Sequence, residues 1–415
     1  MKQLVIENAI LLDMMSDRAQ QGSTIVVEGG QITRIGKPDD FGSMLDNPGV
    51  TRIDVGGAYI MPGITDSHAH LMAAFADIYG GQELVKLQSD ATLAYRCAYN
   101  AKRALMRGIT SLRVVSEARH IDIDLREAIR QGTMIGPRLF VAGQGITSTS
   151  GHGYNSPGTT EIDGPYEAAK AVRQQIKAGA DLIKLMISGG IGTPGEAVDT
   201  PQFSDEELAS AVSTARRVGK TVAVHAGGSE IISRAAQLGV TSVEHGYEIN
   251  DRTAETMVEC GTYLVPTLVV SNDKEYTYDP DRPDWWREKA QRAGEEHIRS
   301  FQRARKAGVP IVAGSDVPDF AEYIFREMEM LYSLGMSGHE VLVSATRTPA
   351  EMCGLADVGG TLQPGKRADM IVVREDPRKP KNLRDLLMVI KDGTVYRDER
   401  RQSSTGLGIH RGEED

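Results

Sequence analysis

The chain has 415 residues, of which 40% are hydrophobic and 25% are charged, and its formal net charge is -10. This composition is ordinary for a globular protein and argues against disorder over most of the length. The acidic balance gives no reason to expect nucleic acid or an anionic membrane surface as a partner, and the length permits one large domain with a smaller one.

The N-terminal region is predicted to be β-structure. Residues 4–15, 23–36 and 51–60 are rich in β-branched side chains and are separated by Gly, Asp and Pro turn signals. In residues 1–15 the apolar positions are interrupted by Glu7, Asn8 and Asp13. Neither a signal peptide nor a membrane-spanning helix fits such a segment, so we expect a cytoplasmic protein.

Between residues 60 and 355, short apolar strands alternate with longer amphipathic helices. Helical periodicity runs through residues 91–106, 166–178 and 205–218, and Ser204 with Glu207 forms a capping signal before the third. Strands are expected at residues 60–68, 109–115, 138–143, 181–187, 221–225, 241–245, 262–268 and 309–315. Eight strands alternating with helices predict an α/β fold with a parallel sheet, whose closed form is a (β/α)8 TIM barrel.

The C-terminal region returns to β-structure. Residues 368–374 and 386–397 are predicted to be strands, and the second contains the hairpin dipeptide Asp392-Gly393. We expect the terminal segments, residues 1–59 and 356–415, to build one small β-sandwich beside a central barrel domain of residues 60–355.

The chain contains three cysteines, Cys97, Cys260 and Cys353. They are too few and too far apart for a disulfide framework, and no C-x-x-C spacing indicates a thiolate metal site. We interpret all three as small buried hydrophobic residues.

Side chains of the kinds that bind metals gather at the C-terminal ends of the predicted strands. They are His68, His70, Lys184, His225, His245 and Asp316. In a barrel these ends meet on one face, where enzymes of this architecture place their chemistry. Each residue alone has an ordinary alternative, such as a hydrogen-bonded histidine, a capping aspartate or a lysine that reaches solvent. The joint pattern predicts a metal centre, because imidazole with carboxylate suits zinc, manganese, iron or nickel.

Lys184 lies within an apolar segment, residues 182–186. Burial there favours the neutral amine, and a neutral amine can react with carbon dioxide to form an anionic carbamate. A carbamate can bridge two metal ions that offset its charge. The alternative is a lysine paired with a buried acid.

These motifs resemble the binuclear amidohydrolase superfamily, in the branch of imidazolonepropionase-like and Xaa-Pro-dipeptidase-like enzymes, and the likeness spans nearly the whole chain. It rests on residues 61–70 (MPGITDSHAH), 179–184 (GADLIK), 243–246 (VEHG), 313–316 (AGSD) and 365–370 (GKRADM). The resemblance implies one divalent metal ion, with zinc as first choice, on His68, His70 and Asp316. It implies a second ion on His225 and His245, with a carboxylated Lys184 bridging the two.

The resemblance also implies hydrolysis of an amide-type C–N bond by a hydroxide that bridges the metals. Asp316 is then the catalytic residue, which passes a proton from the hydroxide to the leaving nitrogen. A deaminase is disfavoured, because residues 226–228 are Ala-Gly-Gly where such enzymes carry a His-x-x-Glu motif. A non-enzymatic scaffold of the same fold is a remote alternative.

Three long loops, residues 143–166, 188–203 and 271–288, are expected to build the substrate pocket. The first contains Gly151-His152-Gly153-Tyr154, which resembles a dipeptidase-branch stretch that brings a histidine to the substrate. We therefore expect His152 and Tyr154 to bind substrate, with a histidine held by loop hydrogen bonds as the alternative. Trp285 and Trp286, in the third loop, are expected either to wall a substrate group or to pack a helix.

Two departures from the family pattern bear on the substrate. Dipeptide-cleaving relatives carry a polar side chain just after the fifth-strand histidine, where this chain has Gly227, and they show Arg-Asp where this chain has Arg113-Val114. The first candidates are dipeptides, cleaved in the manner of a dipeptidase or carboxypeptidase, and N-acyl amino acids. The alternative is a neutral urea, carbamate or lactam. We expect a small-molecule substrate, no nucleic-acid or membrane partner, and assembly as a homo-oligomer.

Overall fold

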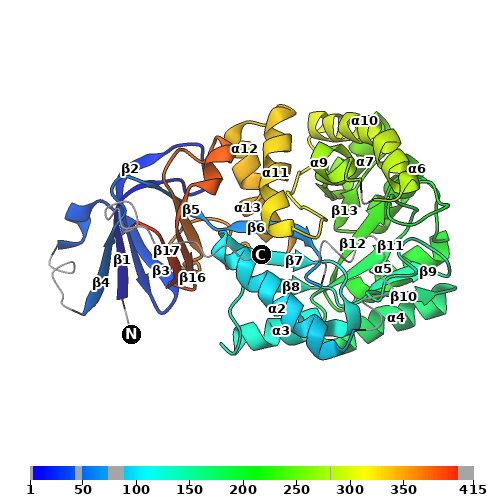
Figure 1. The fold of residues 1–415 in the computed structure, drawn as a ribbon, viewed down its shortest axis with the longest axis horizontal. Coiled ribbons are helices and arrows are strands. Elements are labelled where there is room, and N and C mark those ends of the chain that lie inside the picture. Colours follow the sequence, from blue (N-terminus) through cyan, green and yellow to red (C-terminus); the bar gives the residue numbers. More distant parts are fainter. Residues whose placement is uncertain (1–2, 43–48, 73–87, 281, 401–415) are drawn as a thin grey trace.

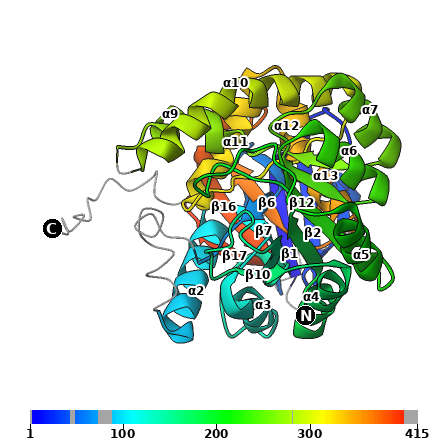
Figure 2. The ribbon, with the colours of Figure 1, turned by 90° about the vertical axis from the view of Figure 1, so that its right-hand side faces the viewer.

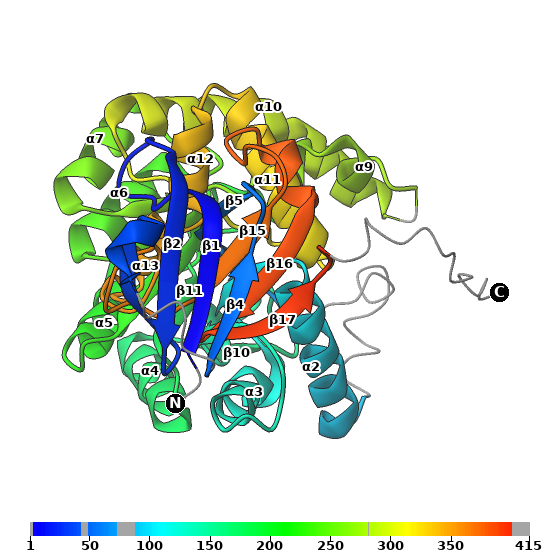
Figure 3. The ribbon, with the colours of Figure 1, turned by 90° about the vertical axis from the view of Figure 1, so that its left-hand side faces the viewer.

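The computed structural model describes residues 3–42, 49–72, 88–280 and 282–400, and in it strands from residues 3–62 and 370–398 form one eight-stranded sheet (Figure 1). The strands of this sheet are β1 (Gln3–Leu11), β2 (Gln20–Glu28), β3 (Gln31–Gly36), β4 (Val50–Asp54), β5 (Tyr59–Pro62), β15 (Met370–Val373), β16 (Leu386–Lys391) and β17 (Thr394–Asp398). Their order is β17-β16-β15-β5-β1-β2-β3, with β4 beside β1 (Figure 3). The antiparallel pair β5 and β15 connects the N-terminal strands to the C-terminal ones.

Glycine-containing turns set the hairpins of this sheet. The predicted strand of residues 23–36 is two strands, because Gly29 and Gly30 turn the chain with φ of 58° and 82°. The predicted hairpin at Asp392-Gly393 is present between β16 and β17, with φ of 48° and 72°. Positive φ at both turn residues is what a two-residue hairpin with the right-handed twist of its strands requires.

The middle of the chain alternates parallel strands with helices. One parallel sheet contains β6 (Ile64–Ala69), β7 (Ile109–Val114) and β8 (Arg138–Val141). The second sheet, in the order β10-β9-β11-β12-β13-β14, contains β9 (Gly145–Ser148), β10 (Thr159–Ile162), β11 (Leu182–Met186), β12 (Thr221–Ala226), β13 (Ser242–His245) and β14 (Tyr263–Val265). A backbone hydrogen bond of 2.7 Å from Asp181 N to Val141 O links the two sheets.

Helices surround these strands as a ring when the molecule is viewed from the end opposite the eight-stranded sheet (Figure 2). The longer ones are α2 (Asp90–Met106), α3 (Ile121–Arg130), α4 (Pro165–Ala178), α5 (Asp205–Arg216), α6 (Ser229–Leu238), α7 (Asp251–Cys260), α10 (Asp284–Ala307) and α11 (Phe320–Ser333). The shorter ones are η1 (Pro38–Asp40), η4 (Ala118–His120), α8 (Val269–Asn272), α9 (Lys274–Thr277), α12 (Gly338–Ser344), α13 (Arg347–Met352) and η5 (Pro380–Arg384). The capping box predicted from Ser204 and Glu207 forms at the start of α5.

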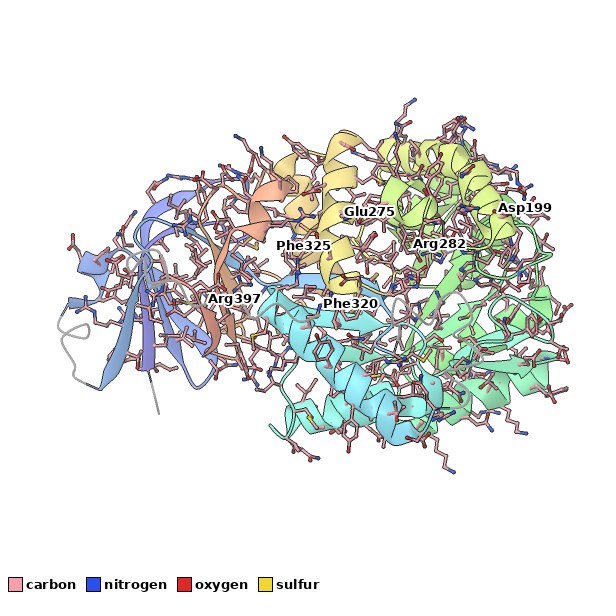
Figure 4. The ribbon with its side chains drawn as sticks, in the orientation of Figure 1. Asp199, Glu275, Arg282, Phe320, Phe325 and Arg397 are labelled. Atoms are coloured by element: carbon pink, nitrogen blue, oxygen red, sulfur yellow. The ribbon has the colours of Figure 1, made fainter. Side chains whose placement is uncertain are left out.

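The main hydrophobic core lies between the parallel strands and this ring of helices, and a second core lies on the eight-stranded sheet. The two parts are connected where Arg397 of β17 donates a hydrogen bond of 2.9 Å to Met106 O at the end of α2 (Figure 4). In the described part of the chain, no helix combines the length and apolar character needed to cross a membrane.

Two predicted strands differ from the observed ones at their connections. The predicted strand of residues 60–68 is divided between β5 and β6 at Gly63, where an added Cβ would lie 2.2 Å from the Thr110 side chain. The predicted strand of residues 309–315 forms only an isolated bridge between Leu264 and Ile311. A continuous ladder does not form there because Pro310 has no N–H, and because Val312 N and Ala313 N donate to different segments, at Leu264 O and Ser344 O.

Other predictions need smaller corrections. The predicted loop of residues 143–166 contains β9 and β10, and the loop of residues 271–288 contains α9 and the start of α10. The prediction that all three cysteines are buried is confirmed for Cys97, but Cys353 is only partly buried and Cys260 is exposed. Cys260 is the last residue of α7, before the left-handed Gly261, and there the helix end faces solvent.

Candidate metal centre

His68, His70 and Asp316 form the first part of the centre. Both histidines come from the C-terminal end of β6, and Asp316 is placed beside them by a hydrogen bond of 2.8 Å from its N–H to His68 O. Oδ1 of Asp316 lies 3.3 Å from Nε2 of His68 and 3.0 Å from Nε2 of His70. One ligand atom of each residue lies within 4.8 Å of the others, a spacing that suits one divalent cation.

His225 and His245 form the second part, at the ends of the neighbouring strands β12 and β13. Their ring centroids lie 4.5 Å apart, and the ring of His245 lies 5.2 Å from that of His68. All three of these imidazoles are buried. The structure therefore places the four predicted histidines and Asp316 next to one another.

Each of the four histidines bonds one ring nitrogen to a neighbouring oxygen. The contacts are His68 Nδ1 with Glu244 Oε2 at 2.9 Å, His70 Nδ1 with Ser116 O at 3.0 Å, His225 Nε2 with Gly189 O at 3.0 Å, and His245 Nδ1 with Thr267 Oγ1 at 2.7 Å. Where the partner is a carbonyl or carboxylate oxygen, the ring nitrogen carries a proton. For His68 and His225 the opposite nitrogen then keeps a lone pair, whereas Nε2 of His70 also bonds to Asp316 Oδ1, at 3.0 Å. Metal-binding histidines are usually held in this way, and the donor set therefore fits divalent cations.

Lys184 of β11 is buried, as its apolar neighbours predict. Burial lowers the pKa of Lys184 to about 8, although the carboxylates of Glu244 and Asp316 act in the opposite direction. Among the described residues its Nζ forms neither a hydrogen bond nor an ion pair. The neutral amine, the form that reacts with carbon dioxide, is thus accessible at mildly alkaline pH.

Burial also sets the protonation of the neighbouring groups. It lowers the pKa of His68 to about 4 and holds the pKa of His225 and of His245 well below the ordinary value, which favours the neutral imidazole that binds metals. Burial raises the pKa of Asp66 to about 7. The Asp66 carboxyl accepts hydrogen bonds from both Ser315 N and Ser315 Oγ, and so ties β6 to the residue before Asp316.

Unusual backbone conformations gather at this centre. Ser116, His245, Thr267 and Asp316 have φ of 132°, 68°, 48° and 52°, a region that non-glycine residues rarely adopt. Two of them are predicted metal ligands and two hold a histidine of the centre. Such conformations persist where the surrounding structure enforces them, and they are typical of functional sites.

His152 is brought to the centre by stacking on His225, with ring centroids 4.1 Å apart and an interplanar angle of 17°. Nδ1 of His152 contacts the Glu196 carboxylate and lies 3.3 Å from Thr193 Oγ1. Gly190 lies against the stacked pair, because an added Cβ would be 2.4 Å from His152 Cε1. His152 is therefore held by hydrogen bonds of the loops and also lies beside a predicted metal ligand, so it meets both interpretations made from the sequence.

The described part of the structure shows no contact between the other predicted pocket residues, Tyr154, Trp285 and Trp286, and the four histidines. Tyr154 is 44% exposed, and no contact among the described residues joins its ring to the four histidines, so its role stays a prediction. Trp286 is buried in α10 and stacks on the Arg282 guanidinium at 3.9 Å, which fits helix packing. Trp285 is partly exposed and lies 5.8 Å from Lys289 Nζ.

Several residues of the centre were not found from the sequence. They are Ser116, Gly189, Glu196, Glu244 and Thr267. Two of these contribute a backbone carbonyl, for which the side chain gives no signal. Glu244 could have been predicted from the sequence, because an acidic residue inside a fully buried strand, directly before His245, needs a polar or charged partner. Burial alone would raise the pKa of Glu244, but Arg113 and His68 hold it well below its usual range.

Comparison with known proteins agrees with this geometry. The sequence matches the amidohydrolase family over residues 59–396. It is 29% identical to ochratoxinase of Aspergillus niger over 348 residues, covering 77% of this chain and 70% of the relative. It is 26% identical to imidazolonepropionase of Bradyrhizobium diazoefficiens over 410 residues, covering 88% of this chain and 91% of that relative.

The structure is also similar to that of a Xaa-Pro dipeptidase with methionine bound in the active site. The TM-score is 0.85 and the identity 31%, over 95% of this chain and all of the other (100%). The chain therefore belongs to the amidohydrolase family, in the branch that includes imidazolonepropionase and Xaa-Pro dipeptidase.

Proposed function

We propose that the protein is a metal-dependent hydrolase of amide-type C–N bonds. His68, His70 and Asp316 would hold one divalent cation, His225 and His245 a second, and a carboxylated Lys184 would lie between them. The observation that carries the proposal is that four histidines and Asp316 meet at one place, with one ring nitrogen of each histidine held by a neighbouring oxygen and with Nε2 of both His68 and His70 facing Asp316 Oδ1. Zinc is the first candidate for both cations.

We further propose that the two parallel sheets belong to one (β/α)8 barrel of residues 60–355, flanked by a β-sandwich of residues 1–59 and 356–415. Two sets of contacts support this arrangement. The hydrogen bond from Asp181 N to Val141 O joins the sheets on one side, and the bond of 3.1 Å from Ser67 N to Ala313 O joins the segment after Ile311 to β6 on the other.

Asp316 is proposed to move the proton during hydrolysis. When bound, the cations would lower the pKa of a water molecule and polarise the scissile carbonyl. Asp66 and Glu244 are fully buried and hydrogen-bonded through both carboxylate oxygens, whereas the Asp316 side chain is 19% exposed and its Oδ1 faces His68 and His70. Asp316 is therefore placed to accept a proton from the attacking water and to donate it to the leaving nitrogen.

The first substrate class that we propose is a dipeptide or N-acyl amino acid, in which the leaving group carries a carboxylate. The similar Xaa-Pro dipeptidase holds methionine in its active site, which supports an amino acid on the leaving side. Thr193 connects His152 to Lys289. Its Oγ1 lies 3.3 Å from His152 Nδ1, and its carbonyl oxygen accepts a hydrogen bond of 2.7 Å from Lys289 Nζ. His152 and Lys289 are the candidates to meet the carboxylate.

Gly227 favours the second candidate class, neutral ureas, carbamates and lactams. An added Cβ at Gly227 would lie 1.9 Å from Val198 O, so no side chain at this position can hold a substrate carboxylate. The loop that contains Val198 and Asp199 passes over this position, and Asp199 lies at the end of the molecule far from the eight-stranded sheet (Figure 4). A buried carboxylate without donors would cost several kcal/mol.

Replacing His152 with alanine tests the preferred class. We expect kcat/KM for N-acyl amino acids to fall by about 10- to 100-fold, because a hydrogen bond to a charged group contributes about 1.5–3 kcal/mol. The loss for the matching N-acyl amino acid amides, which lack the carboxylate, should be several-fold smaller. His339→Ala is the control, since His339 lies in α12 and contacts Asp17 instead of the centre.

The substrate screen itself compares Xaa-Pro and Xaa-Arg dipeptides and N-acyl amino acids with phenylureas, carbamates and lactams. It uses the zinc-loaded enzyme in bicarbonate buffer. Turnover of carboxylate-bearing substrates supports the first class. Turnover of a neutral urea or carbamate while all carboxylate-bearing substrates fail would show that the missing side chain at Gly227 decides specificity.

A further inference from the structure

Glu244 connects His68 to a buried arginine. Its side chain is fully buried on β13, where Oε2 lies 2.9 Å from His68 Nδ1. The other oxygen, Oε1, accepts hydrogen bonds from Arg113 Nη2 at 2.5 Å and from Ser242 Oγ at 2.6 Å. One carboxylate oxygen thus faces His68, and the other faces Arg113 and Ser242.

Arg113 is fixed in place by hydrogen bonds, and it acts toward Glu244 only as a hydrogen-bond donor. It is buried on β7, and besides Glu244 it donates from Nε to Ser67 O at 2.6 Å and from Nη1 to Ser242 Oγ at 2.9 Å. A guanidinium has no acceptor atom, so whatever group lies at the Oε1 position must accept. Arg113 therefore fixes which way a group at position 244 can be oriented.

We propose that Glu244 and Arg113 are positioning residues that set the tautomer of His68. An ionised carboxylate only accepts, so His68 Nδ1 carries the proton and His68 Nε2 presents its lone pair toward Asp316. This inference rests on the proposed metal centre, because the lone pair matters only if Nε2 binds a cation.

Glutamine at position 244 makes the proposal testable, because its amide has one acceptor and one donor end. Arg113 requires the acceptor, so in Glu244→Gln the NH₂ group faces His68 and donates to Nδ1. The ring must then protonate Nε2, which removes the lone pair from the metal side. Replacing Arg113 with methionine as well frees the amide to turn its oxygen to His68. Methionine is chosen because it is unbranched and has neither donor N–H groups nor charge, and because Met352 Sδ already lies 3.7 Å from Arg113 Nη1.

Metal binding is measured by equilibrium dialysis with Zn²⁺ and by visible absorption of the Co²⁺-loaded protein. We expect Glu244→Gln to weaken binding of the cation by about 10- to 100-fold, and the double variant Arg113→Met/Glu244→Gln to regain at least about half of that loss on a logarithmic scale. Asp122→Asn is the control. Asp122 is also a fully buried carboxylate, but it accepts from Ile123 N and Gly143 N and contacts none of the four histidines.

The tautomer is measured directly in the metal-free wild-type protein by ¹⁵N NMR of labelled histidines, with His68→Gln used for assignment. We expect protonated Nδ1 and unprotonated Nε2, and this measurement decides the matter if Glu244→Gln does not fold. A proton on Nε2, wild-type affinity in Glu244→Gln, or a double variant no better than the single one would overturn the inference. Wild-type protein that binds no cation would overturn the proposed function instead, while the tautomer still tests the positioning role.

Discussion

Replacing Lys184 with alanine is expected to lower turnover by more than about 10³-fold, because a missing bridging ligand removes several kcal/mol of stabilisation from the reacting groups. The fold should survive, since the substitution removes a buried amine that has neither a hydrogen bond nor an ion pair among the described residues. Kinetics of the zinc-loaded variant, with thermal denaturation to check folding, measure both effects.

Short-chain carboxylic acids provide the sharper test of the same residue. In Lys184→Ala an added acid can enter the space left by the side chain and supply the bridging carboxylate, so part of the activity should return. Lys184→Met fills that space and should not be rescued. The control is Lys391→Ala, which removes a buried lysine from β16 that pairs with Asp392 at 3.1 Å. Full activity in Lys184→Ala without added acid would exclude a bridging role.

Replacing Asp316 with asparagine is expected to lower kcat by about 10²-fold or more, the usual contribution of a general base. The change is structurally conservative. Asp316 has φ of 52°, and asparagine tolerates this left-handed conformation better than other residues that lack a carboxylate. Its amide oxygen can still contact His70, so the loss reports the missing proton acceptor.

Asp392→Asn is the matched control for this prediction. Asp392 has a similar φ of 48°, but it lies in the hairpin between β16 and β17. Its substitution should leave kcat unchanged. If Asp316→Asn kept most of its turnover but bound less zinc, Asp316 would be a metal ligand without a role in proton transfer.

Much of the centre could be predicted because parallel strands bring their C-terminal ends together. His68, His225 and His245 are far apart in the sequence, yet each ends or follows a short apolar strand, and the structure places them side by side. Local signals were also sufficient for the hairpin at Asp392-Gly393, because that dipeptide adopts the required positive φ with little strain.

The remaining features depend on contacts between distant segments. The division of β5 from β6 at Gly63 follows from the closeness of Thr110, which no local pattern shows. The segment of residues 309–315 has the apolar character of a strand, but its backbone groups bond to two different segments. Likewise the sequence alone indicated no role for Arg113. Its role follows from its hydrogen bond to Glu244, a residue 131 positions away.

The most direct test of the account is the metal content of the protein. Metal-free protein is dialysed against zinc in bicarbonate buffer, and the bound metal is measured by mass spectrometry together with amidase activity. The account predicts two equivalents of zinc per chain, with activity that appears on loading and disappears on chelation. Less than about one tenth of an equivalent in folded protein, or equal activity with and without metal, would contradict it.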